Sequence, residues 1–103
     1  MEFHHVGIPT DQKRENESLV EGGKVWVTDA DACPFHIEWL RFEPDSPMPD
    51  QLKTIPHVAY KVDDLAAAME GQDVLIEPFE AMPGLKVAFI LHDGAPIEFM
   101  QAC

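Results

Sequence analysis

Basic residues are scarce in this sequence. Only 7 of its 103 residues are Lys or Arg, whereas 19 are Asp or Glu, which gives a formal net charge of −12 at pH 7. Such an excess of negative charge repels phosphate backbones and anionic lipid headgroups. We therefore expect neither nucleic acid nor a membrane as a partner. An anionic substrate would depend on a metal ion or on local bases such as Arg41, Lys53 or Lys86.

Cysteine is also scarce, and long apolar runs are absent. Cys33 and Cys103 show none of the paired spacings that mark a disulfide framework or a zinc site. No run approaches the roughly 18 apolar residues of a membrane-spanning helix. The segment that begins at Met1 lacks the basic and apolar regions of a signal peptide. The sequence therefore predicts a cytoplasmic protein with two free thiols.

A repeated pattern divides the chain into two halves. The sequence HVGIPTD at 5–11 recurs as HVAYKVD at 57–63. A second pattern, in which Ile-Glu precedes an aromatic and then a long aliphatic residue, occurs at 37–40 and again at 97–100. Two matches in the same order, at the start and the end of two successive segments, indicate a duplicated module.

The second module has the pattern strand, helix, strand, strand, strand. Its helix is expected from Asp64 to Glu70, because this segment begins with a capping aspartate, is rich in alanine and stops at Gly71. Pro83-Gly84 and Asp93-Gly94 predict turns. Alternating β-branched and aromatic residues predict its strands at 58–62, 73–76, 86–91 and 96–100.

The first module is shorter by about eight residues, which is about two turns of helix. Its segment Asp11–Ser18 is polar throughout and has no apolar stripe that could dock on a sheet, so it predicts a loop or a single turn. Three prolines between Glu43 and Asp50 predict a linker. The strands of this module are expected at 3–6, 24–28 and 35–39. We divide the single domain 1–103 into module one at 1–43, a linker at 44–54 and module two at 55–103.

Each module opens with a histidine and ends in a strand that contains a glutamate. Because side chains alternate along a strand, Glu38 and Glu98 each face away from their apolar neighbours. If those neighbours pack outward, both carboxylates face the concave side of the sheet, where burial is costly unless they are paired or bound to metal. Together with His5 and His57 they form a mixed nitrogen and oxygen set, which suits Zn, Fe, Ni, Co or Mn better than Ca.

Simpler interpretations apply to these residues when each is taken alone. Single strand glutamates such as Glu38 and Glu98 are usually surface residues, and only the repeat favours a site. A lone histidine is more often structural than a ligand, which is our expectation for His4, His36 and His92. His4 alternates with His5 along the strand, so at most one of them can face a pocket.

The chain resembles the vicinal oxygen chelate superfamily, which includes glyoxalase I, methylmalonyl-CoA epimerase, extradiol dioxygenases, and bleomycin- and fosfomycin-resistance proteins. The resemblance covers nearly the whole chain. It rests on HVGI at 5–8, IEWL at 37–40, HVAY at 57–60 and IEFM at 97–100. The sequence IEWLRFEP followed by DSP at 37–47 is most similar to the glyoxalase I and epimerase branches.

The resemblance implies an α+β fold of two tandem βαβββ modules that form a curved, metal-enclosing sheet, here with the helix of the first module shortened or missing. It implies one divalent ion, Zn, Ni, Co, Fe or Mn, bound by His5, Glu38, His57 and Glu98. In this family the ion binds two substrate oxygens and stabilises an enediolate-like intermediate while a carboxylate moves a proton. The implied function is therefore a metal-dependent lyase or isomerase for a small hydroxy-carbonyl or thioester substrate, with Glu98 as the base and Glu38 as its counterpart.

Two alternatives remain open. The first is a dioxygenase, although its usual site has two histidines and one glutamate, and a fourth acidic ligand at Glu38 argues against it. The second is a non-catalytic protein that binds a small molecule or a metal on the same fold. The short first module and the lack of an obvious basic cluster for a glutathione or CoA tail keep this second alternative open.

We also expect a homodimer. A sheet buries one face against a helix or another sheet, and module one has no amphipathic helix to provide that cover. A second copy would then cover the apolar patch, most simply in a two-fold dimer. The competing expectation is a monomer in which the loop 11–22 or the proline-rich linker folds over the patch. The residues expected to be partly bare are Phe3, Trp26, Ile37 or Trp39.

Overall fold

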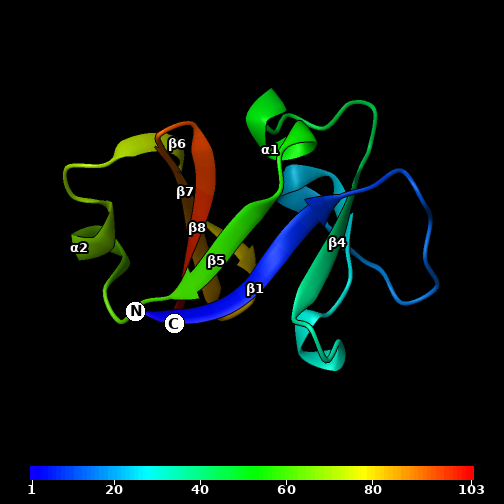
Figure 1. Cartoon of the computed structure of the whole chain (residues 1–103), viewed down its shortest axis with the longest axis horizontal. Coiled ribbons are helices and arrows are strands. Elements are labelled where there is room, and N and C mark those ends of the chain that lie inside the picture. The colour runs from blue at the N-terminus through cyan, green and yellow to red at the C-terminus, as the bar shows by residue number, and fades with distance from the viewer.

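The computed structural model describes the whole chain, residues 1–103, as one curled sheet of eight strands. The strands are Glu2–Pro9 (β1), Ser18–Val20 (β2), Val25–Val27 (β3), Ile37–Phe42 (β4), His57–Lys61 (β5), Asp73–Met82 (β6), Leu85–His92 (β7) and Ala95–Ala102 (β8). Their order across the sheet is β2-β3-β4-β1-β5-β8-β7-β6. Strands β1 and β5 lie side by side in the middle, and the two halves curl toward each other from this seam (Figure 1).

The two halves repeat the same pairing. Strand β1 runs parallel to β4, and β5 runs parallel to β8. The registers correspond as well, because Gly7 pairs with Glu38 in the first half and Ala59 pairs with Glu98 in the second. The predicted α+β class and the duplicated module are therefore confirmed.

The helices are short. Helix α2 (Leu65–Met69) confirms the predicted helix of module two, and the Asp64 side chain caps it by accepting a hydrogen bond of 3.1 Å from the Ala67 amide. Gly71, with a φ of 75°, turns the chain into β6. A second helix, α1 (Asp50–Thr54), was not predicted and lies in the segment expected to be a linker. None of the helices has the length and apolar character needed to cross a membrane.

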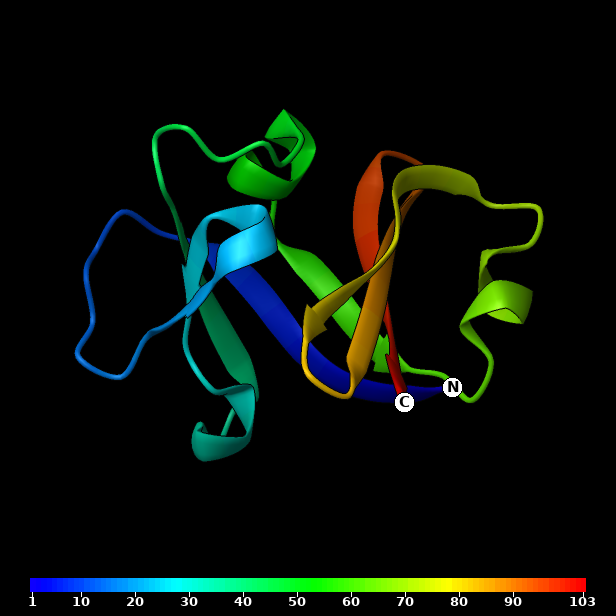
Figure 2. The same ribbon diagram turned by 180° about the vertical axis from the view of Figure 1, so that it is seen from behind.

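Module one has no helix between its first two strands, as predicted. The loop after β1 instead packs on the outer side of β4, where the Arg14 guanidinium lies 4.4 Å from the centroid of a Trp39 ring. Glu17 anchors the loop by accepting a hydrogen bond of 3.0 Å from Nε of Arg41. This loop and helix α2 lie at opposite ends of the molecule (Figure 2). The expected homodimer stays a prediction.

Apolar side chains form a core on each side of the second half of the sheet. Within the curl the core comprises Leu52, Ala59, Val87, Phe89 and Met100. Outside it, α2 covers a second core of Leu65, Ala88, Ile90 and Phe99. Alternating residues of β7 thus point to opposite faces, as the pleat requires. Ile97 and Phe99 both belong to the outer side, which leaves Glu98 facing inward as predicted.

Candidate metal centre

The four residues singled out in the sequence converge inside the curl. His5, Glu38, His57 and Glu98 each offer one ligand atom, and these atoms all lie within 4.8 Å of one another. The four central strands β1, β4, β5 and β8 provide one residue each. The matched registers of the two parallel pairs therefore bring both glutamates to the same depth in the curl.

Small residues opposite the histidines provide the space for their rings. His57 pairs with Gly7 across the seam of β1 and β5, and a Cβ atom added at Gly7 would lie 2.1 Å from Cε1 of His57. His5 pairs in the same way with Ala59, which is completely buried. Glycine is therefore required at position 7 because the His57 ring occupies the space of a side chain, and not because the chain turns there.

The polar contacts within the cluster are few. His57 Nε2 lies 2.9 Å from Oε1 of Glu98. His5 Nε2 lies 3.4 Å from Oε1 of both Glu38 and Glu98, which is too long for a good hydrogen bond, so this buried nitrogen has no close partner. The side chains of both histidines are almost inaccessible, whereas that of Glu38 is 20% exposed.

The electrostatics of the cluster favour a positive charge at its centre. Burial is the largest single influence on the pKa of His5 and lowers it, but Glu38 and Glu98 together outweigh burial and raise that pKa from 6.5 to about 10. Burial raises the pKa of Glu98, but hydrogen bonds and charge from His5 and His57 outweigh it and lower that pKa from 4.5 to about 2. A proton on His5 meets this demand, and a divalent cation would meet it better.

The donor set fits one divalent transition-metal ion. Two imidazole nitrogens and two carboxylates suit Zn, Ni, Co, Fe or Mn. Ligands about 2.1 Å from an ion lie up to roughly 4.2 Å apart, so the observed span of 4.8 Å needs only a small contraction. An ion among these atoms would also give the orphaned Nε2 of His5 a partner. The residues present can therefore hold one ion.

His4, which is expected from the sequence to be only structural, contacts His5 of the cluster from behind, and Asp31 in turn contacts His4. The β1–β5 pairing shifts register between Phe3 and His5, and this bulge lets His4 Nδ1 approach to 2.8 Å from His5 Nδ1. On its other side, His4 Nε2 lies 3.3 Å from Oδ1 of Asp31. Regular alternation would have placed His4 away from His5, and no local motif signals a bulge. His4 stays outside the ligand cluster, and His36 and His92 are exposed.

This chain of contacts defines the tautomer of His5. For Nε2 of His5 to bind an ion, its proton must be on Nδ1, which then donates to Nδ1 of His4. His4 must in turn carry its own proton on Nε2, facing Asp31. Partners of this kind commonly orient metal-bound histidines and raise their basicity.

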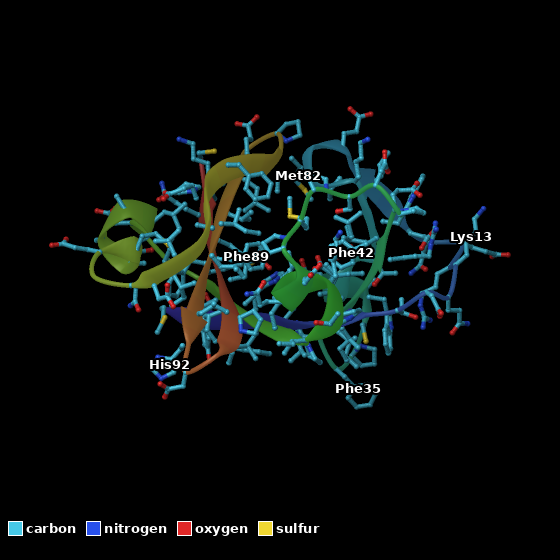
Figure 3. The ribbon with its side chains drawn as sticks, turned by 90° about the horizontal axis from the view of Figure 1, so that it is seen from above. Lys13, Phe35, Phe42, Met82, Phe89 and His92 are labelled. Atoms are coloured by element: carbon cyan, nitrogen blue, oxygen red, sulfur yellow. The ribbon has the colours of Figure 1, made fainter.

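An apolar cavity of about 80 Å³ opens onto the cluster. His5, Glu38 and Glu98 line it, whereas His57 does not. Side chains from both halves of the sheet surround it, and Phe42, Met82 and Phe89 face the space between the halves while Lys13, Phe35 and His92 project away from it (Figure 3). The cavity therefore gives a small molecule access to three of the four cluster residues.

No protein-family model matches this sequence, and no curated protein sequence matches it either. Among solved structures, the fold is similar to that of the hypothetical protein BH1468 from Bacillus halodurans C-125, with a TM-score of 0.67 and 17% sequence identity. The match covers 99% of this chain and 94% of that one. It shows a shared fold over the whole chain, and the curled half-barrel is consistent with the vicinal oxygen chelate type of architecture.

Proposed function

We propose that this protein is a metal-dependent lyase or isomerase of the vicinal oxygen chelate superfamily, related in its motifs to glyoxalase I and methylmalonyl-CoA epimerase. The observation that carries the proposal is the buried cluster of two imidazoles and two carboxylates at the floor of a cavity. Such a group is costly to bury without a cation, and four strands from two repeated modules each contribute one member.

The ligands would be His5, Glu38, His57 and Glu98. A divalent ion held there would stabilise negative charge that develops on two adjacent oxygens of a substrate. The substrate would enter from the cavity, because three of the four residues line it. His5 and His57 are both buried, each with 1% of the residue exposed.

Glu98 is the proposed base, with Glu38 as its counterpart. The contacts with His5 and His57 keep Glu98 ionised, so that it can accept a proton from the carbon next to a substrate carbonyl. The Glu38 side chain is more exposed, at 20% against 9% for Glu98, and its one close ionic contact is His5. This greater freedom suits Glu38 to donate a proton of its own to the neighbouring position, and exchange of protons with solvent would then reset both carboxylates for the next turnover.

A non-catalytic binding protein is the second candidate. The observation that favours it is the absence of Ser, Thr, Tyr, Lys and Arg from the cavity wall. The only polar side chains there belong to the proposed ligand set, so no separate acid or base is available. This candidate shares the metal centre and differs only in lacking turnover.

Proton exchange separates the two candidates. The protein, stripped with a chelator and reloaded with each of Zn, Ni, Co, Fe and Mn, would be incubated with small α-hydroxyketones in D2O, and NMR would follow deuterium at the carbon beside the carbonyl. An enzyme incorporates deuterium with metal and loses most of this activity in Glu98→Gln and Glu38→Gln. The control is Glu77→Gln, which alters an exposed glutamate of β6. Metal binding without exchange would instead support the binding protein.

A further inference from the structure

The wall of the cavity above the cluster is almost wholly hydrophobic. Of the 18 residues that line it, 14 are hydrophobic, and the others are Gly23 and the three cluster residues His5, Glu38 and Glu98. All of the polarity of the cavity therefore lies at the metal-binding end. Both modules build the apolar part, which includes Val25 and Leu40 from the first and Val87 and Phe89 from the second.

No cationic side chain lines this cavity. The chain has only 7 Lys and Arg residues, and two of those nearest in sequence to the cavity strands are already paired: Arg41 with Glu17, and Lys24 with Asp45. A phosphate or carboxylate in the body of a ligand would find no partner in the wall. It would also be repelled by a chain with a formal net charge of −12.

The size of the cavity sets a second limit. A water molecule needs about 10–15 Å³ of such volume, so the cavity of about 80 Å³ has room for roughly five to eight non-hydrogen atoms. That is enough for a two-oxygen group and a short apolar chain or a small ring. It is too little for the peptide or nucleotide tail of a thioester.

We infer that the ligand of this site is a small molecule with two adjacent oxygens at one end and a short, uncharged, apolar body at the other. The inference rests on the proposed function, because the oxygens are taken to bind the metal. It narrows the substrate from a hydroxy-carbonyl compound or a thioester to a short-chain hydroxy-carbonyl compound. The apolar body would displace water from the hydrophobic wall, which favours binding.

A series of alkyl hydroxamates tests the inference, since each of them presents the same two-oxygen chelating group. Calorimetry would measure their dissociation constants on the metal-loaded protein, from acetohydroxamate to hexanohydroxamate. We expect the affinity to rise about threefold to fourfold with each methylene that enters the cavity and to level off once the cavity is full. Succinic monohydroxamate, with a charged end, should bind no more tightly than acetohydroxamate.

Cavity variants give the matched controls. Ala81 also lines the cavity, and Ala81→Leu should shrink the cavity and flatten the dependence on chain length without changing the affinity for metal. Met82→Ala shortens a side chain of the wall that is 47% exposed. It should enlarge the cavity, so that the affinity continues to rise for one or two further methylenes. The control Ala66→Leu introduces the same change of side chain at an exposed residue of α2. It should change neither the hydroxamate affinities nor their dependence on chain length.

The outcomes distinguish this inference from the proposed function. Metal and acetohydroxamate binding with affinities indifferent to chain length, or tighter binding of the charged compound, would overturn the apolar ligand and leave the metal centre intact. A protein that binds no divalent ion, or whose bound ion accepts no hydroxamate, would overturn the proposed function and this inference with it.

Discussion

The two modules have the same inner face and different outer faces. Inside the curl, each contributes one histidine and one glutamate from strands paired in the same register. Outside it, module two is covered by α2, whose Leu65 packs with Ile90 and Phe99 of the sheet. Module one is covered by a loop that places Arg14 over Trp39. The outer face can therefore be covered in two ways, while the inner face keeps its register.

The physical reason is that the inner face tolerates no change of strand register, whereas the outer face tolerates different covering segments. A strand register cannot slip by one residue without sending every side chain to the opposite face, so the cluster requires the pairing of β1 with β4 and of β5 with β8. The outer face needs only apolar contact, and the length of whatever provides it can vary. Module one has no helix between its first two strands, and Glu38 still lies in the cluster.

The cover should matter more for stability in module two, and this is the largest effect we expect. Phe99 is 4% exposed beneath α2, and Phe99→Ala should lower the free energy of unfolding by about 3–5 kcal/mol. Trp39 is only partly buried, so Trp39→Ala should lower it less despite removing a larger side chain. Urea denaturation would measure the free energy of unfolding of both variants, and an unchanged m-value would show that only stability has changed. Equal losses would mean that the loop covers its face as tightly as the helix does.

The seam between the modules offers a second comparison, Gly7 against Ala59. Gly7→Ala would bring a Cβ atom within 2.1 Å of the His57 ring, and the overpacking should lower stability by about 1–3 kcal/mol and weaken metal binding by displacing that ring. Ala59→Gly adds no atom and should cost about 0.5–1 kcal/mol without loss of metal binding. Denaturation and metal titration of both variants test this. Tight metal binding by Gly7→Ala would show that His57 is not a ligand.

The two histidines also differ in their support. His5 is backed by His4 and Asp31, whereas Nδ1 of the buried His57 has no hydrogen-bond partner. His4→Ala should therefore weaken metal affinity by about 10–100-fold through loss of ring orientation, and Asp31→Asn should weaken it less. His92→Ala is the control, because His92 is exposed and remote from the cluster. If His4→Ala left the metal affinity unchanged, the contacts of His4 and Asp31 would not position His5.

The stability of the metal-free protein should also depend on pH, because His5 and Glu98 have opposite pKa shifts. The raised pKa of His5 gives stability that is complete below its unfolded value of 6.5 and is lost as the pH rises through about 10. The lowered pKa of Glu98 gives stability that is complete above 4.5 and is lost as the pH falls through about 2. Unfolding monitored by circular dichroism should thus show a plateau between about pH 4.5 and 6.5. In His5→Asn the loss of stability at alkaline pH should vanish. If that loss persisted, His5 would not be the group that causes it.

The sequence was sufficient to predict that the four residues converge, but not to predict the contacts that support them. His5, Glu38, His57 and Glu98 could be found because a repeat marks residues that share a structural role, and strand alternation then gives their direction. Strand β2 and helix α1 were missed because three and five residues are too few to show a period. The bulge at His4 depends on pairing with β5, and the contact of Arg14 with Trp39 depends on a folded loop. Neither leaves a local pattern in the chain.

Metal titration of the chelator-treated protein tests the central claim most directly. Calorimetry at pH 7, together with the melting temperature, would compare the natural sequence with Glu98→Gln and with the surface control Glu77→Gln. We expect one divalent ion per chain, release of about one proton as the ion replaces that on His5, and a higher melting temperature that Glu98→Gln largely abolishes and Glu77→Gln retains. A protein that binds none of Zn, Ni, Co, Fe or Mn, or binds them equally well in Glu98→Gln, would contradict a metal centre at this cluster.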